Sequence, residues 1–168
     1  SFTVRLLTGV YPYGDLDGTL PERLRWLARQ QFVVPADPPA DYTFRHALIQ
    51  EVAYGSLPHA RRQALHRAIA HMVEVSSAGE VAEQLEFVAL HYYRGREWCR
   101  ALPYLLLAGQ KAQREYANEA AVAQFQRALR AAEEAGEPYG EQSLAAHEAL
   151  AEVLTIVGQY DEALEHLQ

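Results

Sequence analysis

The segment that decides the fold runs from Tyr42 to His66 and reads YTFRHALIQEVAYGSLPHARRQALH. It opens with a β-prone run, Tyr42 to Phe44, and continues into two stretches in which apolar residues recur every three or four positions. Gly55 ends the first stretch, and Pro58 opens the second. His46 stands where the strand enters the first of these helices. The segment therefore predicts one short strand followed by two amphipathic helices.

Upstream of this segment, the chain predicts two helices and a second short strand. Apolar residues from Phe2 to about Val10 fit a short helix, and the turn-rich stretch YPYGDLDG follows it. Thr19 and Glu22 have the spacing of a capping box for a second helix that runs to about residue 30. Phe32 to Val34 is β-prone, and the prolines of PADPPAD separate it from the next strand. Two helices followed by a two-stranded wing are the layout of a winged helix.

Downstream of Gly79, every apolar pattern is helical and arranged in hairpins. The last hairpin is the clearest, because a small residue, a turn glycine and a second small residue lie where two antiparallel helices must approach closely. These positions are Ala151, Gly158 and Ala163. The pattern resembles the tetratricopeptide repeat (TPR), a helix-turn-helix unit of about 34 residues that stacks into a solenoid.

The repeats are irregular. The equivalent small residues Ala101, Ala121 and Ala163 are separated by 20 and then by 42 residues, so an insertion is expected around residues 136 to 142. Pro103 lies inside the helix shared by the first two hairpins and predicts a kink there.

The sequence thus predicts a mainly α fold, with a partial winged helix and its short β-wing followed by an irregular TPR-like α-solenoid of antiparallel helix pairs. The expected divisions are a partial winged-helix domain with a short β-hairpin over residues 1–57, a connecting helix over 58–78, and TPR-like repeats over 79–168. The array is expected to be truncated at its C-terminus and to continue beyond Gln168.

Composition narrows the classes of function. The chain has 168 residues, 49% of them hydrophobic, and no run approaches the roughly 18 apolar residues of a membrane span. The single cysteine, Cys99, cannot form an intrachain disulfide and is expected to pack beside Trp98. No signal peptide opens the sequence, so the cytoplasm is the expected compartment. Residues 1–75 carry a net charge of +1 and residues 76–168 a net charge of −8, which makes the second half a poor candidate for nucleic acid.

A family resemblance follows from the segment from Tyr42 to Glu74, together with YLLLAGQKAQREYANEAAVAQFQRAL. Both stretches resemble the region downstream of the nucleotide-binding domain in bacterial STAND-type signalling ATPases. In that family a P-loop domain precedes a winged helix and TPRs, often with an adenylate or guanylate cyclase domain or a DNA-binding domain elsewhere. The resemblance covers Phe2 to Leu167. No glycine-rich lysine loop occurs here, so this chain is not expected to hydrolyse ATP itself.

The resemblance implies a role for His46. In these ATPases a histidine at the strand-to-helix joint contacts a phosphate of the bound nucleotide, and a helix start is a ready anion site. ATP or ADP would therefore meet His46 only in the full-length parent, and no cofactor is expected for this chain alone. Ala47 follows His46, where the family usually has Asp. The alternative is that His46 caps the helix or packs beside Phe44.

Partner-binding residues follow from the analogy with TPR arrays, which bind partners on the concave face of their first helices. The residues expected to face that groove and to contact a protein or peptide ligand are Glu83, Glu86, Tyr93, Gln110 and Arg114. The alternative is that the tyrosines of this half, including Tyr92, Tyr104 and Tyr116, mostly fill the core.

Other charged and titratable residues have simpler interpretations. His66 and His71 are five apart on one helix, not the four that suits two metal ligands, so no metal site is expected. A set of arginines precedes the wing, at Arg23, Arg25 and Arg29, where a DNA-reading winged helix would place its recognition helix. A second set, Arg61, Arg62 and Arg67, is expected to form ion pairs with Glu51 or Glu74.

No catalytic constellation emerges, so the chain is interpreted as a non-catalytic interaction and coupling region of a larger bacterial signalling ATPase. Its expected partners are a protein or peptide ligand and the upstream nucleotide-binding domain, with no membrane partner, and DNA is not the favoured one. Two alternatives remain open: a fragment of a cyclase-linked enzyme whose catalytic domain lies elsewhere, and a DNA-binding transcriptional regulator.

Overall fold

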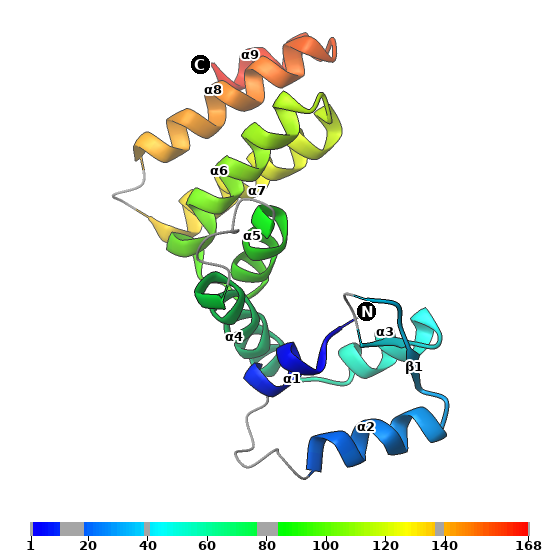
Figure 1. The fold of residues 1–168 in the computed structure, drawn as a ribbon. Coiled ribbons are helices and arrows are strands. Elements are labelled where there is room, and N and C mark those ends of the chain that lie inside the picture. The colour runs from blue at the N-terminus through cyan, green and yellow to red at the C-terminus, as the bar shows by residue number, and fades with distance from the viewer. Residues whose placement is uncertain (1, 11–18, 39–40, 77–83, 137–139, 168) are drawn as a thin grey trace. The chain divides into compact units, whose positions relative to one another are not determined.

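The computed structural model describes residues 2–10, 19–38, 41–76, 84–136 and 140–167 (Figure 1). Over these residues the fold is mainly helical with one small antiparallel sheet, as the sequence predicts. In chain order the elements are α1 (Val4–Val10), α2 (Thr19–Arg29), β1 (Val33–Pro35), β2 (Tyr42–Phe44), α3 (Ala47–Gly55), α4 (His59–Ser76), α5 (Leu85–Arg94), α6 (Trp98–Arg114), α7 (Asn118–Ala135), α8 (Gly140–Ile156) and α9 (Tyr160–His166).

The chain divides into two compact units within α4. Unit 1 is Ser1–Met72 and unit 2 is Val73–Gln168, so α4 contributes residues to both. The boundary lies inside a helix. The apolar pattern of α4 continues across it, since Ala70 of unit 1 and Val73 of unit 2 are both buried.

The small sheet of unit 1 pairs β1 with β2 in antiparallel register, with Val33 opposite Phe44. Both strands lie within one residue of their predicted positions. Phe2 was expected to begin the first helix, but its backbone N donates to the carbonyl oxygen of Tyr42 at 2.8 Å, in a bridge beside β2. Its ring lies against those of Tyr42 and Phe44, at centroid distances of 6.1 and 5.8 Å. The helix therefore begins later, at Val4.

A buried histidine joins α3 to α4. The Nε2 atom of His66 lies 2.9 Å from the hydroxyl oxygen of Tyr54, and the side chain of His66 is 7% exposed. The guanidinium carbon of Arg62 lies 5.1 Å from the centroid of the Tyr54 ring, so the ion pair expected of Arg62 is replaced by a cation–π contact. In contrast, Leu48 and Val52 of the apolar stripe of α3 are exposed, by 68% and 63%.

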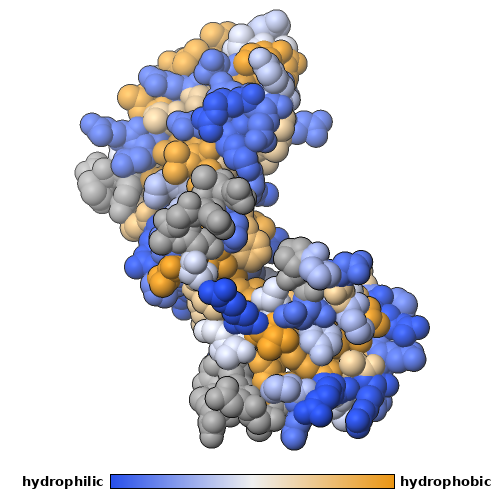
Figure 2. Space-filling model, viewed as in Figure 1, coloured by the Kyte–Doolittle hydropathy of each residue, from blue (hydrophilic) through white to orange (hydrophobic). Residues whose placement is uncertain are grey.

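In unit 2 each helix from α5 to α9 packs against the next one in the chain (Figure 1). The pairs enclose a continuous core whose largest fully buried side chains include Tyr92, Leu102, Leu105, Phe125, Leu150 and Leu154. The small residues Ala101, Ala121 and Ala163 are buried just after the turns that join α5 to α6, α6 to α7 and α8 to α9. Apolar side chains also remain exposed on the last helices, where Figure 2 shows orange surface at the end of unit 2 that holds α8 and α9.

Three turns in the described residues of unit 2 share one backbone geometry. Arg96, Tyr116 and Gly158 have positive φ angles of 57°, 58° and 82°. In each case the next residue donates its N–H to the carbonyl oxygen five residues earlier, at 2.9 to 3.0 Å. This is the glycine-favouring helix end that satisfies carbonyls otherwise left without partners. The same connection therefore recurs at intervals of 20 and 42 residues, which match the spacing of the small residues in the sequence.

Close contact between α6 and α7 depends on Gly109. A Cβ atom at this position would lie 2.5 Å from Cε1 of Phe125, whose side chain is fully buried. No normal carbon contact is that short, so only glycine lets the two helices meet at this distance with the ring between them.

One local expectation is corrected, because Cys99 is exposed and not buried. Pro103 lies inside α6, which runs from Trp98 to Arg114 as one element, and the kink expected there stays a prediction. Of the insertion expected around residues 136 to 142, residues 137–139 lie outside the described part, and α8 already begins at Gly140. The side chain of Thr19, one half of the predicted capping box, also lies outside the described part.

Replacing Gly109 by Ala is expected to destabilise the chain. Overpacking a filled core costs about 1 to 3 kcal/mol, which outweighs the roughly 1 kcal/mol that Ala gains over Gly inside a helix. Urea unfolding followed by circular dichroism measures the change. The matched control is Gly140→Ala, where a Cβ meets nothing and stability should be kept or raised. An unchanged midpoint for Gly109→Ala would contradict the close approach.

Replacing Tyr116 by Gly is expected to stabilise the chain, by up to about 1 kcal/mol, because a side chain with positive φ is strained there. Little packing is lost, since Tyr116 is 87% exposed. The reverse substitution, Gly158→Ala, should lower stability at the equivalent turn. Thermal unfolding compares the two, and a lower melting temperature for Tyr116→Gly would count against the equivalence of the turns.

Candidate functional site

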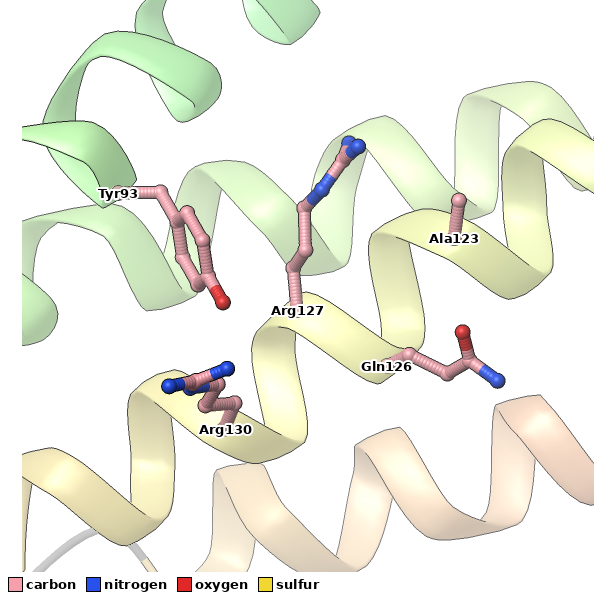
Figure 3. Close-up of a pocket in the computed structure, with 5 residues that line it drawn as sticks. All are labelled: Tyr93, Ala123, Gln126, Arg127 and Arg130. Carbon is pink, nitrogen blue, oxygen red and sulfur yellow. The ribbon is translucent and has the colours of Figure 1, made fainter.

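Two adjoining pockets lie along one side of α7 in unit 2. The first has a volume of about 270 Å³ and is lined by Tyr93, Ala123, Gln126, Arg127 and Arg130 (Figure 3). The second has a volume of about 380 Å³ and is lined by Asn118, Glu119, Val122, Ala123, Gln126, Val157 and Gln159. Because Ala123 and Gln126 line both, the pockets form one hollow, which we call the α7 groove.

The groove exists because α7 has two different faces. The buried face carries Ala121, Phe125 and Ala128 at helical spacing, and all three are fully buried in the core. The groove face carries Glu119, Val122, Ala123, Gln126, Arg127 and Arg130, which recur every three or four residues on the other side. Ala123 is the smallest of these side chains, and its position in both pockets keeps the middle of the groove open.

Tyr93, on α5, is the one residue from outside α7 among those that line the first pocket. Its ring packs edge to face on Trp98, with centroids 5.3 Å apart and planes at 71°, which holds the ring in place. Figure 3 shows its hydroxyl end directed toward the stretch of α7 that carries Arg127 and Arg130. Tyr93, Arg127 and Arg130 therefore line one pocket, although in Figure 3 the guanidinium of Arg127 is directed away from the tyrosyl hydroxyl.

The two arginines keep donors available for a ligand. Arg127 donates to the side-chain oxygen of Gln124 at 3.4 Å, which is a long hydrogen bond, and Arg130 is exposed. Neither forms an ion pair with any residue in the described ranges. A guanidinium presents five donors in a planar fork that suits carboxylate and phosphate groups. The pocket can therefore bind an anionic group.

Of the residues predicted to bind a partner, the structure places Tyr93 in the groove. Glu86 instead accepts a hydrogen bond from Nζ of Lys111 at 3.1 Å and forms an ion pair with it. Gln110 and Arg114 are exposed on α6 and do not line the groove, and Glu83 lies outside the described residues. Sequence reasoning missed Arg127 and Arg130.

The tyrosines of unit 2 have separate roles. Among the tyrosines of the described residues 84–136 and 140–167, Tyr92 alone is fully buried, at 1% exposure, while Tyr116 is 87% exposed. The alternative in which these tyrosines mostly fill the core therefore holds for Tyr92 and is wrong for Tyr116.

His46 lies at the joint between β2 and α3, where the sequence places it. It is the N-cap residue of α3, with φ −135° and ψ 139°, and its side chain makes no capping hydrogen bond. The imidazole is exposed. His46 therefore occupies the N-cap position without capping the helix through its side chain.

The titratable groups with the most perturbed pKa values form a cluster around Glu74. The hydroxyls of Tyr92 and Tyr104 donate to the two carboxylate oxygens of Glu74 at 2.5 and 2.6 Å, and Nη1 of Arg100 lies 3.8 Å from that carboxylate. Burial, and then the hydrogen bond to Glu74, raise the pKa of Tyr104 to about 12 and also raise that of Tyr92. These groups satisfy one another, so the cluster ties the last turn of α4 to α5 and α6.

No metal centre is found in the part of the chain that the structure describes, where no three His, Cys, Asp or Glu side chains converge. His66 forms a hydrogen bond with the hydroxyl of Tyr54, and His71 is exposed. Within the same ranges, no helix has both the length and the apolar character of a membrane span.

Comparison with protein-family models, with curated proteins and with solved structures finds no match.

The Glu74 cluster predicts a loss of stability at alkaline pH. The folded-state pKa of Tyr104, about 12, lies above the ordinary value of 10.0. Its contribution is therefore fully present below pH 10 and is lost as pH rises through about 12. Glu74→Gln should move the tyrosine titration to lower pH, as measured by tyrosinate absorbance. It should also cost about 1 to 2 kcal/mol at neutral pH, a value reduced by the 32% exposure of the Glu74 side chain.

The matched control is Glu86→Gln, which breaks an exposed ion pair without touching the tyrosines. It should leave the tyrosine titration as it is and change stability little. If Glu74→Gln gave the same tyrosine titration as the unaltered chain, the role of the carboxylate would be disproved.

Proposed function

We propose that this chain is a non-catalytic interaction and coupling region of a larger bacterial signalling ATPase of the STAND type, and that unit 2 binds a protein or peptide in the α7 groove. The observation that carries the proposal is the recurrence of one turn at three hairpins, with an open groove on the array that they build. Stacked hairpins form extended surfaces on which other chains bind.

The TPR-like character of unit 2 is supported by the small residues at its hairpins. Ala101, Ala121 and Ala163 are buried and each follows its turn residue by five positions. Gly109 has the corresponding role on α6, where the next hairpin approaches. The uneven spacing is accounted for by α6, which packs against α5 on one side and α7 on the other and so serves two hairpins.

The winged-helix character of unit 1 is supported by its two-stranded antiparallel sheet and by the helices around it. His46 adds to this, because an exposed imidazole at the start of α3 suits contact with a phosphate. In the full-length parent, located in the cytoplasm, the nucleotide would be ATP or ADP held by an upstream domain.

Helix α4 would couple partner binding by unit 2 to nucleotide contact by unit 1. Its residues belong to both units, and its last turn is tied to α5 and α6 through Glu74. A ligand in the groove would act on unit 2, and α4 would relay the effect to unit 1 and the upstream nucleotide-binding domain.

Panning a random peptide library on the 168-residue chain tests the binding function. We expect enriched peptides whose binding is lost in Ala123→Gln, because Ala123 lines both pockets and a longer side chain fills the groove. The matched control is Ala120→Gln, the same change on an exposed position of α7 outside the groove. Enriched peptides that bind the two variants equally would overturn the assignment of the groove.

Titration of the same chain with ATP, ADP and duplex DNA separates the alternatives. The proposal expects no tight site for any of them. A specific nucleotide site in this chain would favour the cyclase-linked enzyme fragment, and salt-sensitive binding of DNA that depends on Arg25 and Arg29 would favour the transcriptional regulator.

A further inference from the structure

We infer that His147 and His166 form a binding site for one Zn²⁺ ion, which holds α9 against α8. The two side chains come from neighbouring helices that pack against each other (Figure 1). Their Nδ1 atoms lie 3.0 Å apart, and their ring centroids are separated by 5.1 Å with the planes tilted by 45°. Neither histidine lines the α7 groove, so the inference goes beyond the proposed function.

The distance between the two nitrogen atoms suits a shared ion. Histidine nitrogens bind Zn²⁺ at about 2.0 to 2.1 Å, so two of them at an angle of about 90° to 110° lie roughly 2.9 to 3.3 Å apart. The observed separation of 3.0 Å falls within this range. Without an ion, the same distance fits a hydrogen bond in which one Nδ1–H donates to the other Nδ1. When the ion binds, the donor ring adopts its other tautomer, with the proton on Nε2, and both Nδ1 lone pairs bind the metal.

The charge around the pair favours a cation. From residue 140 to residue 168 the chain has six carboxylate side chains and no lysine or arginine. Three of these carboxylates belong to α9, at Asp161, Glu162 and Glu165. A negative field of this kind raises the local concentration of cations. It does not discriminate among them, but imidazole ligands do, because Mg²⁺ and Ca²⁺ prefer oxygen and Zn²⁺ accepts nitrogen.

The histidine pair supplies two ligands, which agrees with the finding that no three His, Cys, Asp or Glu side chains converge among the described residues. Both imidazoles are half-buried, so water can reach the ion and fill its remaining positions. Glu162 is exposed and lies four residues before His166, so the two side chains are neighbours on the surface of α9. Its carboxylate therefore stabilises the bound ion through its charge.

Helix α9 has few attachments to the rest of unit 2. It has seven residues, and Ala163 is the one buried residue among them. An isolated helix shorter than about 12 residues is marginal in water, so α9 depends on its contacts with α8. In the described part of the chain, one side-chain hydrogen bond joins the two helices, and it is the bond between His147 and His166. An ion bound by both residues therefore strengthens this attachment.

Titration of the 168-residue chain with Zn²⁺, in competition with a chromogenic chelator, tests the site. We expect one Zn²⁺ per chain. His147→Gln and His166→Gln should each weaken its binding about tenfold or more, because one of two protein ligands is lost. Glutamine can keep a hydrogen bond to the remaining histidine, so both variants should stay folded, as circular dichroism checks. The matched control is His71→Gln, the same change at an exposed position of α4, which should bind Zn²⁺ as the unaltered chain does.

Nuclear magnetic resonance of the histidine side-chain nitrogens identifies the ligating atoms. On addition of Zn²⁺, the Nδ1 resonances of His147 and His166 should shift and those of His71 should not. Mg²⁺ at the same concentration should shift neither, because magnesium prefers oxygen ligands. Hydrogen exchange of the α9 amides should slow with Zn²⁺ in the unaltered chain and stay unchanged in His166→Gln.

Three results would overturn the inference: no stoichiometric binding of Zn²⁺, equal Zn²⁺ affinity in His147→Gln and His71→Gln, or Zn²⁺-dependent shifts confined to other histidines. Slower exchange in unit 1 with none in α9 would also contradict it, because the ion would then lie elsewhere. These outcomes are separate from the peptide-binding test, since neither histidine lines the α7 groove.

Discussion

The approach of α6 to α7 at Gly109 is the contact on which unit 2 depends. The ring of Phe125 occupies the space that any side chain at position 109 would need, and the ring is fully buried. Because this contact fixes the orientation of α7, one side of the helix packs in the core and the opposite side is exposed to solvent. The groove is therefore a consequence of how closely two helices pack, because the direction of Arg127 and Arg130 follows from the position of Phe125 on the same helix.

Unit 2 uses polar groups in two different ways. Around Glu74, two tyrosyl hydroxyls donate hydrogen bonds to the carboxylate and a guanidinium forms an ion pair with it. These groups therefore stabilise the folded chain. In the α7 groove, Arg127 and Arg130 line the first pocket and form no ion pair with a carboxylate of the described residues. The Glu74 cluster is recognised by the raised pKa values of its tyrosines, and the α7 groove by two arginines that form no ion pair within the described residues. The first stabilises the helices, and the second is the one that we propose to bind a partner.

Secondary structure was largely predictable, since it follows from local patterns. The strands were placed to within one residue, and the hairpins were located from Ala101, Ala121 and Ala163. The predictions were wrong where a contact with a residue outside the local pattern decides the structure. Phe2 bonds to Tyr42 and leaves the helix, and Arg62 lies over Tyr54 instead of pairing with an acid. Neither contact has a signal in the sequence near the residue concerned.

The candidate site was only partly predictable, for a related reason. Analogy selected Tyr93, which lines the groove, together with Gln110 and Arg114 on α6, which do not line it, and their roles in binding stay predictions. The sequence by itself determined the helices, the turns and the small residues between them, because periodicity, glycine and side-chain size act over a few residues. Only the tertiary structure decided which helix face stays open and which charges lack partners, because both depend on contacts between residues far apart in the chain.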